Sequence, residues 1–567
     1  METWIVILAI FSFTVATAII GRKRMRDARL ALKARLRKQY GMSPNKKYTQ
    51  ESVRHIPKYF EAHRSEDALD DITWNDLAMD DVYARINYCR SAAGEEVLYH
   101  VLRHPVEDRE PEAFENKVLF FMKEQDTRVD AQVLFEGMKQ QSSYSIYDHL
   151  MSLDKDRDCS NFSHYAPLVI IVFLIGACFV RFTMSFVLLI LMIIFNLLTY
   201  YREKGELDAY LSTFQNVLRL ISGASGLSTL LKKSPGKELF ESECKEMDAR
   251  VDAMKVFRAG SAIALSGNRQ TGGSPLDLIL DYLRIATHID LIFFNRMYVH
   301  LLRHVEDVDR LVSVSGMCEV YLAVACYRAS LKEAYCLPEF TDASDGQAFL
   351  LEDGYHPLLM TPVANTIRCE KNVLITGSNA SGKSTFLKTA GIAAVMAQTI
   401  RTVCASSYRA PRYRIYSSMA LNDNLLEGDS YYIVEIKSLK RILDAASSDG
   451  LRVLCFIDEV LRGTNTLERI AASAQILKQF CNRNVQCFAA THDGELTEIL
   501  KGLYDNYHFD GEITEGDVRF DYRLREGIAK TRNAVQLLRM LGYDASIVDE
   551  ADAMAARFLQ TGEWTLS

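Results

Sequence analysis

A glycine-rich stretch in the C-terminal half of the chain has the residue types and the spacing that bind nucleotide phosphates. It reads Gly377, Ser378, Asn379, Ala380, Ser381, Gly382, Lys383, Ser384 and Thr385, and it fits the pattern GxxxxGK[ST]. The glycines let backbone N–H groups surround phosphate oxygens, Lys383 can reach the β- and γ-phosphates, and the Ser384 hydroxyl can ligate Mg²⁺. A β-type run precedes the stretch and a helical pattern follows it, as this kind of loop requires. The nine residues therefore predict a site for ATP and Mg²⁺.

Two adjacent acids, Asp458 and Glu459, end a second β-type run at Leu454–Ile457. We expect this strand to lie beside the strand that precedes the glycine-rich stretch, which would bring Asp458 to the Mg²⁺ shell. Glu459 can then polarise the attacking water as a general base. The structural alternative is an acid pair that only caps a helix.

His492 follows a third β-type run, Val485–Ala490. At the C-terminal end of a strand in such a sheet, a histidine points toward the γ-phosphate and can sense or stabilise it. The alternative is a histidine with a purely structural role in a loop.

The elements that must position these residues divide the chain into two parts. From about residue 346, short strands alternate with helices, which predicts a largely parallel sheet. Before that point, residues 202–265 and 276–335 have apolar residues at helical spacing, typical of a helix-bundle core. Residues 266–275 contain three Gly, two Ser and a Pro and predict a loop. The predicted fold class is thus α plus α/β.

Composition excludes several classes of protein. The chain has 567 residues, of which 49% are hydrophobic and 25% charged, so it can build sizeable cores and is not mainly disordered. Its mean hydropathy of −0.04 is too low for a polytopic transporter. The net charge of −7 gives no global attraction to nucleic acid. Its 12 cysteines form no CxxC pair and no zinc spacing, which indicates a reducing, cytosolic environment.

Two apolar runs nevertheless predict membrane spans. Trp4–Ile20 is uncharged and is followed by the basic run Arg22–Arg26, which is the order of an uncleaved anchor rather than of a signal peptide. Ala166–Tyr200 contains Arg181 as its only charged residue and is long enough for a tight hairpin of two spans. The alternative for the second run is a pair of buried core helices. Three spans would keep all large segments in the cytoplasm of a multi-pass protein of the cell membrane.

The ordered set of motifs resembles the ATPase domain of the MutS family, which is related to the ABC ATPases. The set comprises Tyr355–Leu358, Ile375–Thr385, Asp458–Thr466 and Ala490–Leu496. Its most specific element is the DE-x-x-RGT-x-T run, because other P-loop ATPases lack it. The resemblance covers residues 346–545 well and extends more weakly to the helical core and to a lever region at 276–335. It implies a C-terminal P-loop α/β domain of ABC type after a helical core/lever domain. In this chain the core/lever domain would also carry the transmembrane helices that the apolar runs predict.

The resemblance also implies a composite site in a homodimer. Gly428–Glu435 matches a family run in which a serine, here Ser430, reaches the γ-phosphate bound on the opposing subunit. Asn465 would face the dimer partner. Three departures from the family pattern limit which family properties can be assigned to this chain. No mismatch-reading domain is expected, Ala380 replaces the usual methionine, and residues 530–534 replace a Ser-Tyr-Gly run.

The predicted boundaries follow from these patterns. They are 1–21 for a transmembrane anchor, 22–65 for a basic juxtamembrane helix, 66–165 for the first part of the helical core, 166–201 for the hairpin, 202–345 for the second part of the core and the lever, and 346–567 for the ATPase domain.

Two functions remain open at this point. The first is a membrane-tethered MutS-like ATPase that couples hydrolysis to clamp-like binding of double-stranded DNA or another elongated partner. The second is an ATP-switched membrane sensor or scaffold that does not bind nucleic acid. The basic run at residues 22–40 does not separate them, because anionic lipids attract the same charges. An ABC-type transporter is disfavoured, since three spans make too small a pore.

Overall fold

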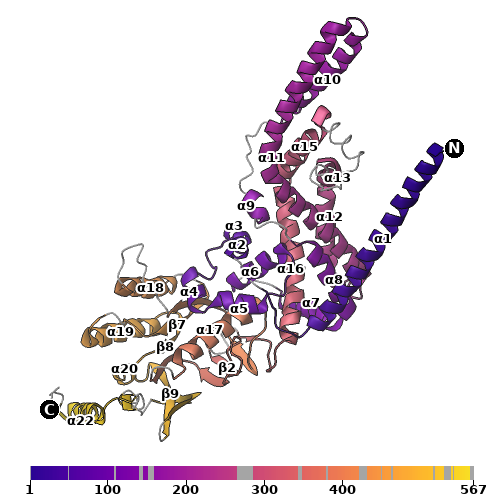
Figure 1. The fold of residues 1–567 in the computed structure, drawn as a ribbon. Helices are drawn as coiled ribbons and strands as arrows, with labels where there is room; N and C mark the ends of the chain where they lie inside the picture. The colour runs from indigo at the N-terminus through magenta and orange to yellow at the C-terminus, as the bar shows by residue number, and fades with distance from the viewer. Residues whose placement is uncertain are drawn as a thin grey trace. The chain divides into compact units, whose positions relative to one another are not determined.

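The computed structural model describes residues 2–46, 48, 50–106, 110–139, 145–150, 159–264, 285–341, 348–378, 381–419, 431–447, 450–461, 464–514, 517–528, 535, 538–539 and 542–561. Contacts divide the chain into two compact units. The helical unit comprises Met1–Arg64, Asn87–His100 and Glu110–Ser330, and the α/β unit comprises Ser65–Ile86, Val101–Arg109 and Leu331–Ser567. The mixture of helices and sheets agrees with the predicted class (Figure 1).

The helical unit is built from long helices and several short ones. They are α1 (Glu2–Gln39), α2 (Gln50–His55), α3 (Lys58–Ala62), most of α6 (Ala92–Arg103), α7 (Pro111–Lys123), α8 (Gln125–Gly137), α9 (Ile146–Leu150), α10 (Phe162–Cys178), α11 (Phe182–Lys233), α12 (Glu241–Ala253), α13 (Lys255–Ala264), α15 (Ile289–Arg303) and α16 (Val305–Ala329). The predicted loop at 266–275 lies outside the described residues.

Helix α16 forms the core of this unit. It is apolar and long enough to cross a membrane, but 78% of its most apolar stretch is buried in the protein. Gly316 lets α6 approach closely, because a Cβ atom there would lie 2.6 Å from the carbonyl oxygen of Ala93. The apolar composition of α16 is therefore explained by packing against its neighbours.

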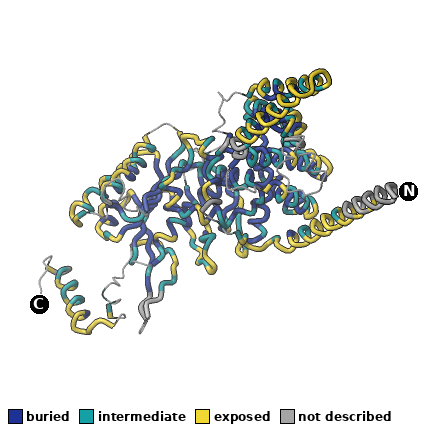
Figure 2. Tube along the Cα trace, turned by 45° about the horizontal axis from the view of Figure 1, so that its top comes forward, coloured by how far each residue is buried: buried dark blue, intermediate teal, exposed yellow. Residues whose placement is uncertain are grey.

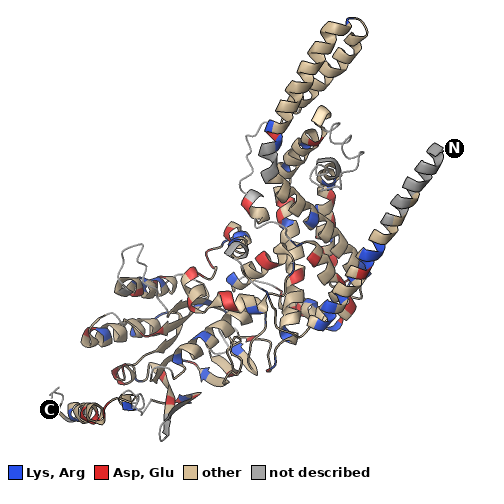
Figure 3. Cartoon of the chain, viewed as in Figure 1, with Lys and Arg blue, Asp and Glu red and all other residues tan. Residues whose placement is uncertain are grey.

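Helices α10 and α11 form the hairpin predicted for Ala166–Tyr200 (Figure 1). Its side chains are mostly exposed, and only 11% of the most apolar stretch of Phe182–Lys204 is buried (Figure 2). Helix α10 and the part of α11 up to Tyr201 contain no Lys, Arg, Asp or Glu (Figure 3). The alternative of a buried helix pair is therefore wrong. The Trp4–Ile20 run forms the first half of α1, where most side chains lie outside the described residues.

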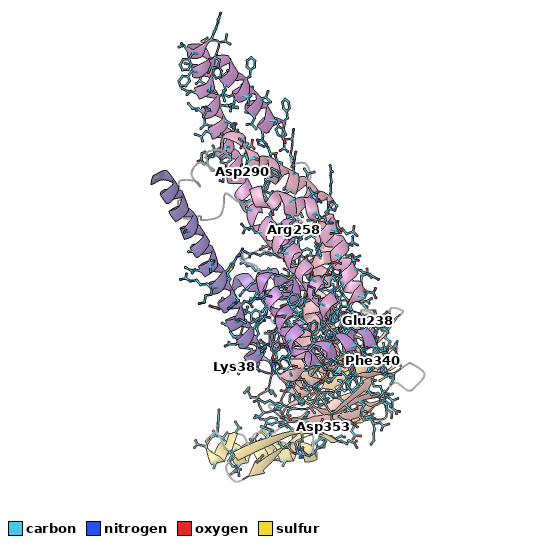
Figure 4. The ribbon with its side chains drawn as sticks, turned by 90° about the vertical axis from the view of Figure 1, so that its right-hand side faces the viewer. Lys38, Glu238, Arg258, Asp290, Phe340 and Asp353 are labelled. Atoms are coloured by element: carbon cyan, nitrogen blue, oxygen red, sulfur yellow. The ribbon has the colours of Figure 1, made fainter. Side chains whose placement is uncertain are left out.

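A network of buried polar groups lies at the foot of the hairpin, which is the end away from the turn at residues 179–181. The Tyr200 hydroxyl donates a hydrogen bond to Asp290 Oδ2 over 2.7 Å, and Figure 4 labels Asp290 at the start of α15. His164 and His288 are almost fully buried, with their Nδ1 atoms 3.2 Å apart. His288 Nε2 lies 3.0 Å from the carbonyl oxygen of Asn196.

The α/β unit consists of two sheets with covering helices. Its elements are α4 (Asp71–Asp76), α5 (Met79–Ile86), β1 (Glu339–Phe340), β2 (Phe349–Gly354), β3 (Asn365–Cys369), β4 (Asn372–Gly377), α17 (Lys383–Thr399), β5 (Ser407–Ala410), β6 (Tyr413–Ser418), α18 (Tyr431–Ala445), β7 (Arg452–Asp458), α19 (Thr466–Cys481), β8 (Val485–Ala490), α20 (Glu495–Ile499), β9 (Tyr504–Thr514), β10 (Asp517–Glu526) and α22 (Ala545–Thr561). The smaller sheet has the strand order β1-β5-β2-β3.

The larger sheet has the strand order β10-β9-β4-β8-β7-β6, and its strands from β9 to β6 are parallel. The parallel sheet was predicted, but one adjacency was wrong. The strand that ends in Asp458 does not lie beside β4, because β8 pairs with both β4 and β7. This order puts the end of β8, and with it His492, between the other two strand ends.

The start of the predicted helical core is divided differently in the structure. Residues 65–86 belong to the α/β unit rather than to the unit that holds most of 66–165. The Thr73 hydroxyl oxygen accepts the N–H of Ser417 over 3.0 Å, and Asp76 Oδ2 accepts the N–H of Met419 over 2.9 Å. These contacts join α4 to the end of β6, so the N-terminal segment completes one edge of the sheet.

Candidate functional site

The candidate site lies where three neighbouring parallel strands end. Ala490 of β8 is paired with Ile375 of β4 on one side and with Asp458 of β7 on the other. The segments that leave these strands carry the glycine-rich loop, Glu459 and His492. Ligands in open α/β sheets bind at this carboxyl edge of the strands.

The glycine-rich loop between β4 and α17 depends on glycine at both ends. Gly377 and Gly382 have φ values of 148° and 110°, which L side chains rarely adopt. A Cβ atom on Gly377 would also lie 2.7 Å from the carbonyl oxygen of Phe509. Within the described residues, the hydroxyl oxygens of Ser378 and Ser381 are buried and have no hydrogen-bond partner. Unsatisfied hydroxyls in a glycine-rich turn fit a site that takes up phosphate oxygens.

Lys383 begins α17 and turns its ammonium group back over the loop. The side chain is 5% exposed, and Nζ donates hydrogen bonds to the carbonyl oxygens of Gly377 (2.7 Å) and Ser378 (2.9 Å). Nζ also lies 3.3 Å from His492 Nε2. A buried ammonium held by carbonyl oxygens can exchange them for phosphate oxygens, which carry more negative charge.

Glu459 and His492 form a pair beside this lysine. Glu459 Oε1 lies 2.9 Å from His492 Nε2, and both side chains are partly accessible. One ring nitrogen cannot donate to a carboxylate and accept from an ammonium at the same time. The shorter, charge-assisted contact assigns the proton to Nε2, which then donates to Glu459. The ammonium of Lys383 and the carboxylate of Glu459 thus both lie close to the same ring nitrogen of His492.

A neighbouring ion pair fixes the segment that carries His492. Arg469 of α19 donates from Nε and from a terminal nitrogen to both carboxylate oxygens of Asp493, over 2.9 and 2.6 Å. This pairing raises the pKa of Arg469. Two parallel hydrogen bonds define both position and orientation, so His492 is held by its neighbour in the chain.

The donor set fits Mg²⁺ rather than a metal held by protein ligands alone. Ser384 is exposed at the start of α17, and Asp458 is half-buried at the end of β7. In the described part of the chain, no group of three or more His, Cys, Asp or Glu residues can hold a metal ion. Mg²⁺ typically takes one or two carboxylates together with substrate phosphates and water. Ser384 and Asp458 are therefore the residues that would hold it.

The structure describes most of the predicted site residues and brings them to one edge of the sheet. These are Gly377, Ser378, Ser381, Gly382, Lys383, Ser384, Thr385, Asp458, Glu459 and His492. The predicted residues Asn379, Ala380 and Ser430 lie outside the described residues.

Two contacts near the site were not predicted from the sequence. Asn465, which was expected to face a dimer partner, caps helix α19: its Oδ1 accepts the N–H of Glu468 over 3.0 Å. The capping pattern Asn-x-x-Glu before an apolar run is a local signal that identifies this role. The second contact joins Glu435 of α18 to the N–H of Leu461 over 2.5 Å. It links residues 26 positions apart, and no local pattern indicates it.

Comparison with known proteins agrees with this geometry. Residues 373–559 match the family model described as MutS domain V. This part of the chain is thus similar to a domain of the MutS family. The matched range of the MutS domain begins in β4 and includes the glycine-rich loop, Asp458, Glu459 and His492.

Curated relatives are similar to the chain over a comparable range. The DNA mismatch repair protein MutS of Natronomonas pharaonis is 32% identical over 251 residues, which is 42% of this chain and 28% of that protein. The protein of the same name from Thermus thermophilus is 30% identical over 45% of this chain and 31% of its own length. That of Lactobacillus delbrueckii subsp. bulgaricus is 27% identical over 50% of this chain and 34% of its own length. The chain thus spans about a third of the length of these curated relatives.

Proposed function

We propose that this chain is a membrane-tethered MutS-like ATPase that binds ATP with Mg²⁺ and hydrolyses it. The observation that carries the proposal is the contact chain from Lys383 through His492 to Glu459 at the ends of β4, β8 and β7. The MutS domain match supports ATP as the nucleotide, because the matched range includes all three residues.

Each residue in the chain of contacts has a separate task in hydrolysis. Lys383 binds the β- and γ-phosphates in exchange for the loop carbonyls, and the Ser378 and Ser381 hydroxyls donate to the phosphate oxygens. Mg²⁺, which Ser384 and Asp458 would hold, would supply positive charge that offsets the charge of the phosphates. Glu459 orients the attacking water and accepts its proton, while His492 holds the Glu459 carboxylate and faces the γ-phosphate. Catalysis then consists mainly of positioning and electrostatic stabilisation.

The test of this proposal is Glu459→Gln in the full-length chain. We expect ATP to bind with unchanged affinity while turnover falls by about 100-fold or more, since general-base catalysis contributes about 10²–10⁴-fold. Steady-state phosphate release and equilibrium binding of ATP measure the two effects. Glu498→Gln, the same chemical change on an exposed residue of α20, is the matched control. Unchanged turnover in Glu459→Gln would remove Glu459 from the mechanism.

The proposed membrane attachment is based on the exposed α10–α11 hairpin. Helix α10 has 17 residues and is about 26 Å long, close to the ~30 Å hydrocarbon core of a bilayer. Arg181 lies in the turn at the tip, while Tyr200, Tyr201 and Arg202 lie at the foot. Charged and aromatic residues at both ends of an apolar segment are typical of membrane interfaces. The buried network around Asp290 marks the end of the apolar segment on the foot side.

Two natural cysteines report the topology of the hairpin. Cys178 ends α10 at the tip, and Cys159 lies just before α10 at the foot. We expect a membrane-impermeant maleimide to label Cys178 in intact cells and Cys159 only after permeabilisation. The variant Cys178→Ser identifies the labelled residue. Labelling of Cys159 in intact cells, or of neither cysteine under any condition, would contradict the tether.

The partner is proposed from resemblance. The relatives are named DNA mismatch repair proteins, which favours a homodimer with composite ATP sites that closes as a clamp on double-stranded DNA. The acidic net charge of −7 favours the alternative, an ATP-switched membrane sensor or scaffold without nucleic acid.

Salt dependence separates the two candidates. For the detergent-solubilised full chain with linear duplex DNA, a clamp that neutralises several phosphates should lose affinity steeply between about 50 and 200 mM salt. Absence of binding, or a Kd that does not change with salt, would exclude the DNA clamp and leave the sensor or scaffold.

A further inference from the structure

The backbone that carries Glu459 has an unusual conformation. Glu459 and Leu461 have φ values of 62° and 61°, in the left-handed region that side chains other than glycine rarely occupy. Such conformations cost about 1–3 kcal/mol each and persist only where surrounding contacts enforce them. The position of the Glu459 carboxylate therefore depends on what holds residues 459–461 in place.

Three hydrogen bonds from three different elements hold these residues. The Glu459 N–H donates to the carbonyl oxygen of Ala490 over 3.0 Å, and the Ser473 hydroxyl of α19 donates to the carbonyl oxygen of Val460 over 3.2 Å. The third bond is the Leu461 N–H to Glu435 Oε1, over 2.5 Å. It alone is made by a side-chain carboxyl group, and the other two bonds end on backbone carbonyl oxygens.

The position of Glu435 on α18 makes it a rigid anchor. Glu435 is 3% exposed, and Leu439 and Ile442 follow it on the same helix face, buried in the apolar core beneath the sheet. Residues at this spacing share one face of a helix. A buried carboxyl group is costly unless it forms hydrogen bonds, so the contact with Leu461 satisfies a need of the Glu435 side chain.

From this arrangement we infer that Glu435 is a positioning residue for hydrolysis: it holds Leu461 in the left-handed conformation and thereby sets the place of Glu459. The inference rests on the proposed ATPase function. It separates two parts of the site, because Lys383 and the glycine-rich loop belong to the segment that joins β4 to α17, whereas Glu435 belongs to α18. Loss of the anchor should thus affect the chemical step and leave ATP binding intact.

The experiment compares Glu435→Met and Glu435→Gln in the full-length chain. Methionine cannot accept the Leu461 N–H, and a displacement of about 1 Å at a reacting group costs up to about 100-fold in rate. We expect kcat to fall about 10- to 100-fold in Glu435→Met, with KM and the stoichiometry of bound ATP unchanged. Glutamine retains a carbonyl oxygen at the same reach, so Glu435→Gln should recover most of kcat.

Two controls make the outcome decisive. Ser438→Ala removes a buried hydroxyl from the same helix and should leave kcat unchanged. If Glu435→Met does not fold, Glu435→Asp replaces it, since the shorter side chain keeps the charge but does not reach Leu461. The inference would be overturned if Glu435→Met or Glu435→Asp kept the kcat of the wild type. It would also be overturned if the fall in kcat were matched by an equal loss in the stoichiometry of bound ATP. Absence of hydrolysis in the wild-type chain would instead overturn the proposed function.

Discussion

Arg328 in the helical unit and Lys383 in the α/β unit are both buried cations, but they have different partners. Arg328 donates from its two terminal nitrogens to both oxygens of Glu115, over 2.6 and 2.9 Å, and its side chain has no exposed surface. Lys383 donates to two backbone carbonyl oxygens of the glycine-rich loop. The hydrogen bonds of the first cation go to a full opposite charge, whereas those described for the second go to backbone dipoles.

This difference separates structural charge from charge that a ligand can use. The Arg328–Glu115 pair is complete within the protein and joins α16 to α7. The carbonyl partners of Lys383 can be replaced by phosphate oxygens without leaving a buried carboxylate unpaired. We therefore expect substitutions in the helical unit to change mainly stability, and substitutions at the strand ends to change mainly ligand binding and turnover.

Breaking the buried ion pair should have the largest effect. Arg328→Met leaves Glu115 without its partner and should lower the free energy of unfolding by about 3–5 kcal/mol. Chemical denaturation of the full chain, followed by hydrogen exchange in peptides of α16, measures the loss. The double variant Glu115→Met/Arg328→Met should recover part of it, because no charge is left unpaired. Lys245→Met, in an exposed pair with Glu241, should have no measurable effect.

Substitution of Lys383 should have the opposite effect: a large loss of ATP affinity and little change in stability. Lys383→Met should weaken ATP binding by about 100-fold, which corresponds to about 3 kcal/mol, and should leave the unfolding transition of the α/β unit nearly unchanged. Equilibrium titration with ATP and thermal unfolding without ATP give the two numbers. A large loss of stability with intact ATP affinity would show that Lys383 is structural, and the comparison would fail.

The two units should also respond to acid in opposite directions. Burial raises the pKa of Glu319 in the helical unit to about 7. Burial, together with the charge of Lys388, lowers the pKa of His356 in the α/β unit to about 4. As the pH falls from 7 to 4.5, the folded helical unit takes up a proton at Glu319 that the unfolded chain does not yet hold, so this group adds stability. As the pH falls from 6.5 to 4, unfolding protonates His356, so that group removes stability.

Each of these effects amounts to at most about 3 kcal/mol. Denaturation at pH 7.5 and pH 5, read by hydrogen exchange in peptides from α16 and β4, tests both signs in one experiment. Glu319→Gln and His356→Asn should each flatten the pH dependence of their own unit alone. The same pH response in both units would contradict the opposite roles of burial in the two cases.

The smallest predicted effect concerns the packing of α6 on α16. Gly316→Ala places a Cβ atom 2.6 Å from the Ala93 carbonyl oxygen and 2.5 Å from Val97 Cγ2, which should cost about 1–2 kcal/mol of stability. Gly176→Ala is the matched control, since nothing lies within 4 Å of its Cβ position and alanine favours a helix. Equal stability of the two variants in thermal unfolding would show that α6 can shift away from α16.

The parts of the site that depend on local pattern could be predicted from the sequence. The glycine spacing around Lys383, the acids after β7 and the parallel strands all follow from residue types within short windows. The order of the strands could not be predicted in this way, because β8 pairs with β4 and β7 through residues more than 30 positions apart. The place of His492 between Lys383 and Glu459 depends on that order.

Contacts over long sequence distances account for the other differences. Asp76 joins the end of β6 through Met419, which lies 343 positions away in the sequence, so no local pattern indicates the contact. Glu435 anchors Leu461 from another helix. In both cases a charged residue on a buried surface is the only sequence signal, and it identifies a need for a partner without identifying the partner.

Helix α11 runs without interruption for 52 residues, from the tip of the hairpin to Lys233 in the helical unit. Such a helix is about 78 Å long and bends only gently. A bilayer thinner than the apolar part of the hairpin makes the spanning helices tilt. Because no loop separates the two ends of α11, the same tilt reaches its buried part among α12 and α16. In the proposed membrane-tethered protein, a change in the thickness of the surrounding lipid would thus change the orientation of α11 within the helical unit.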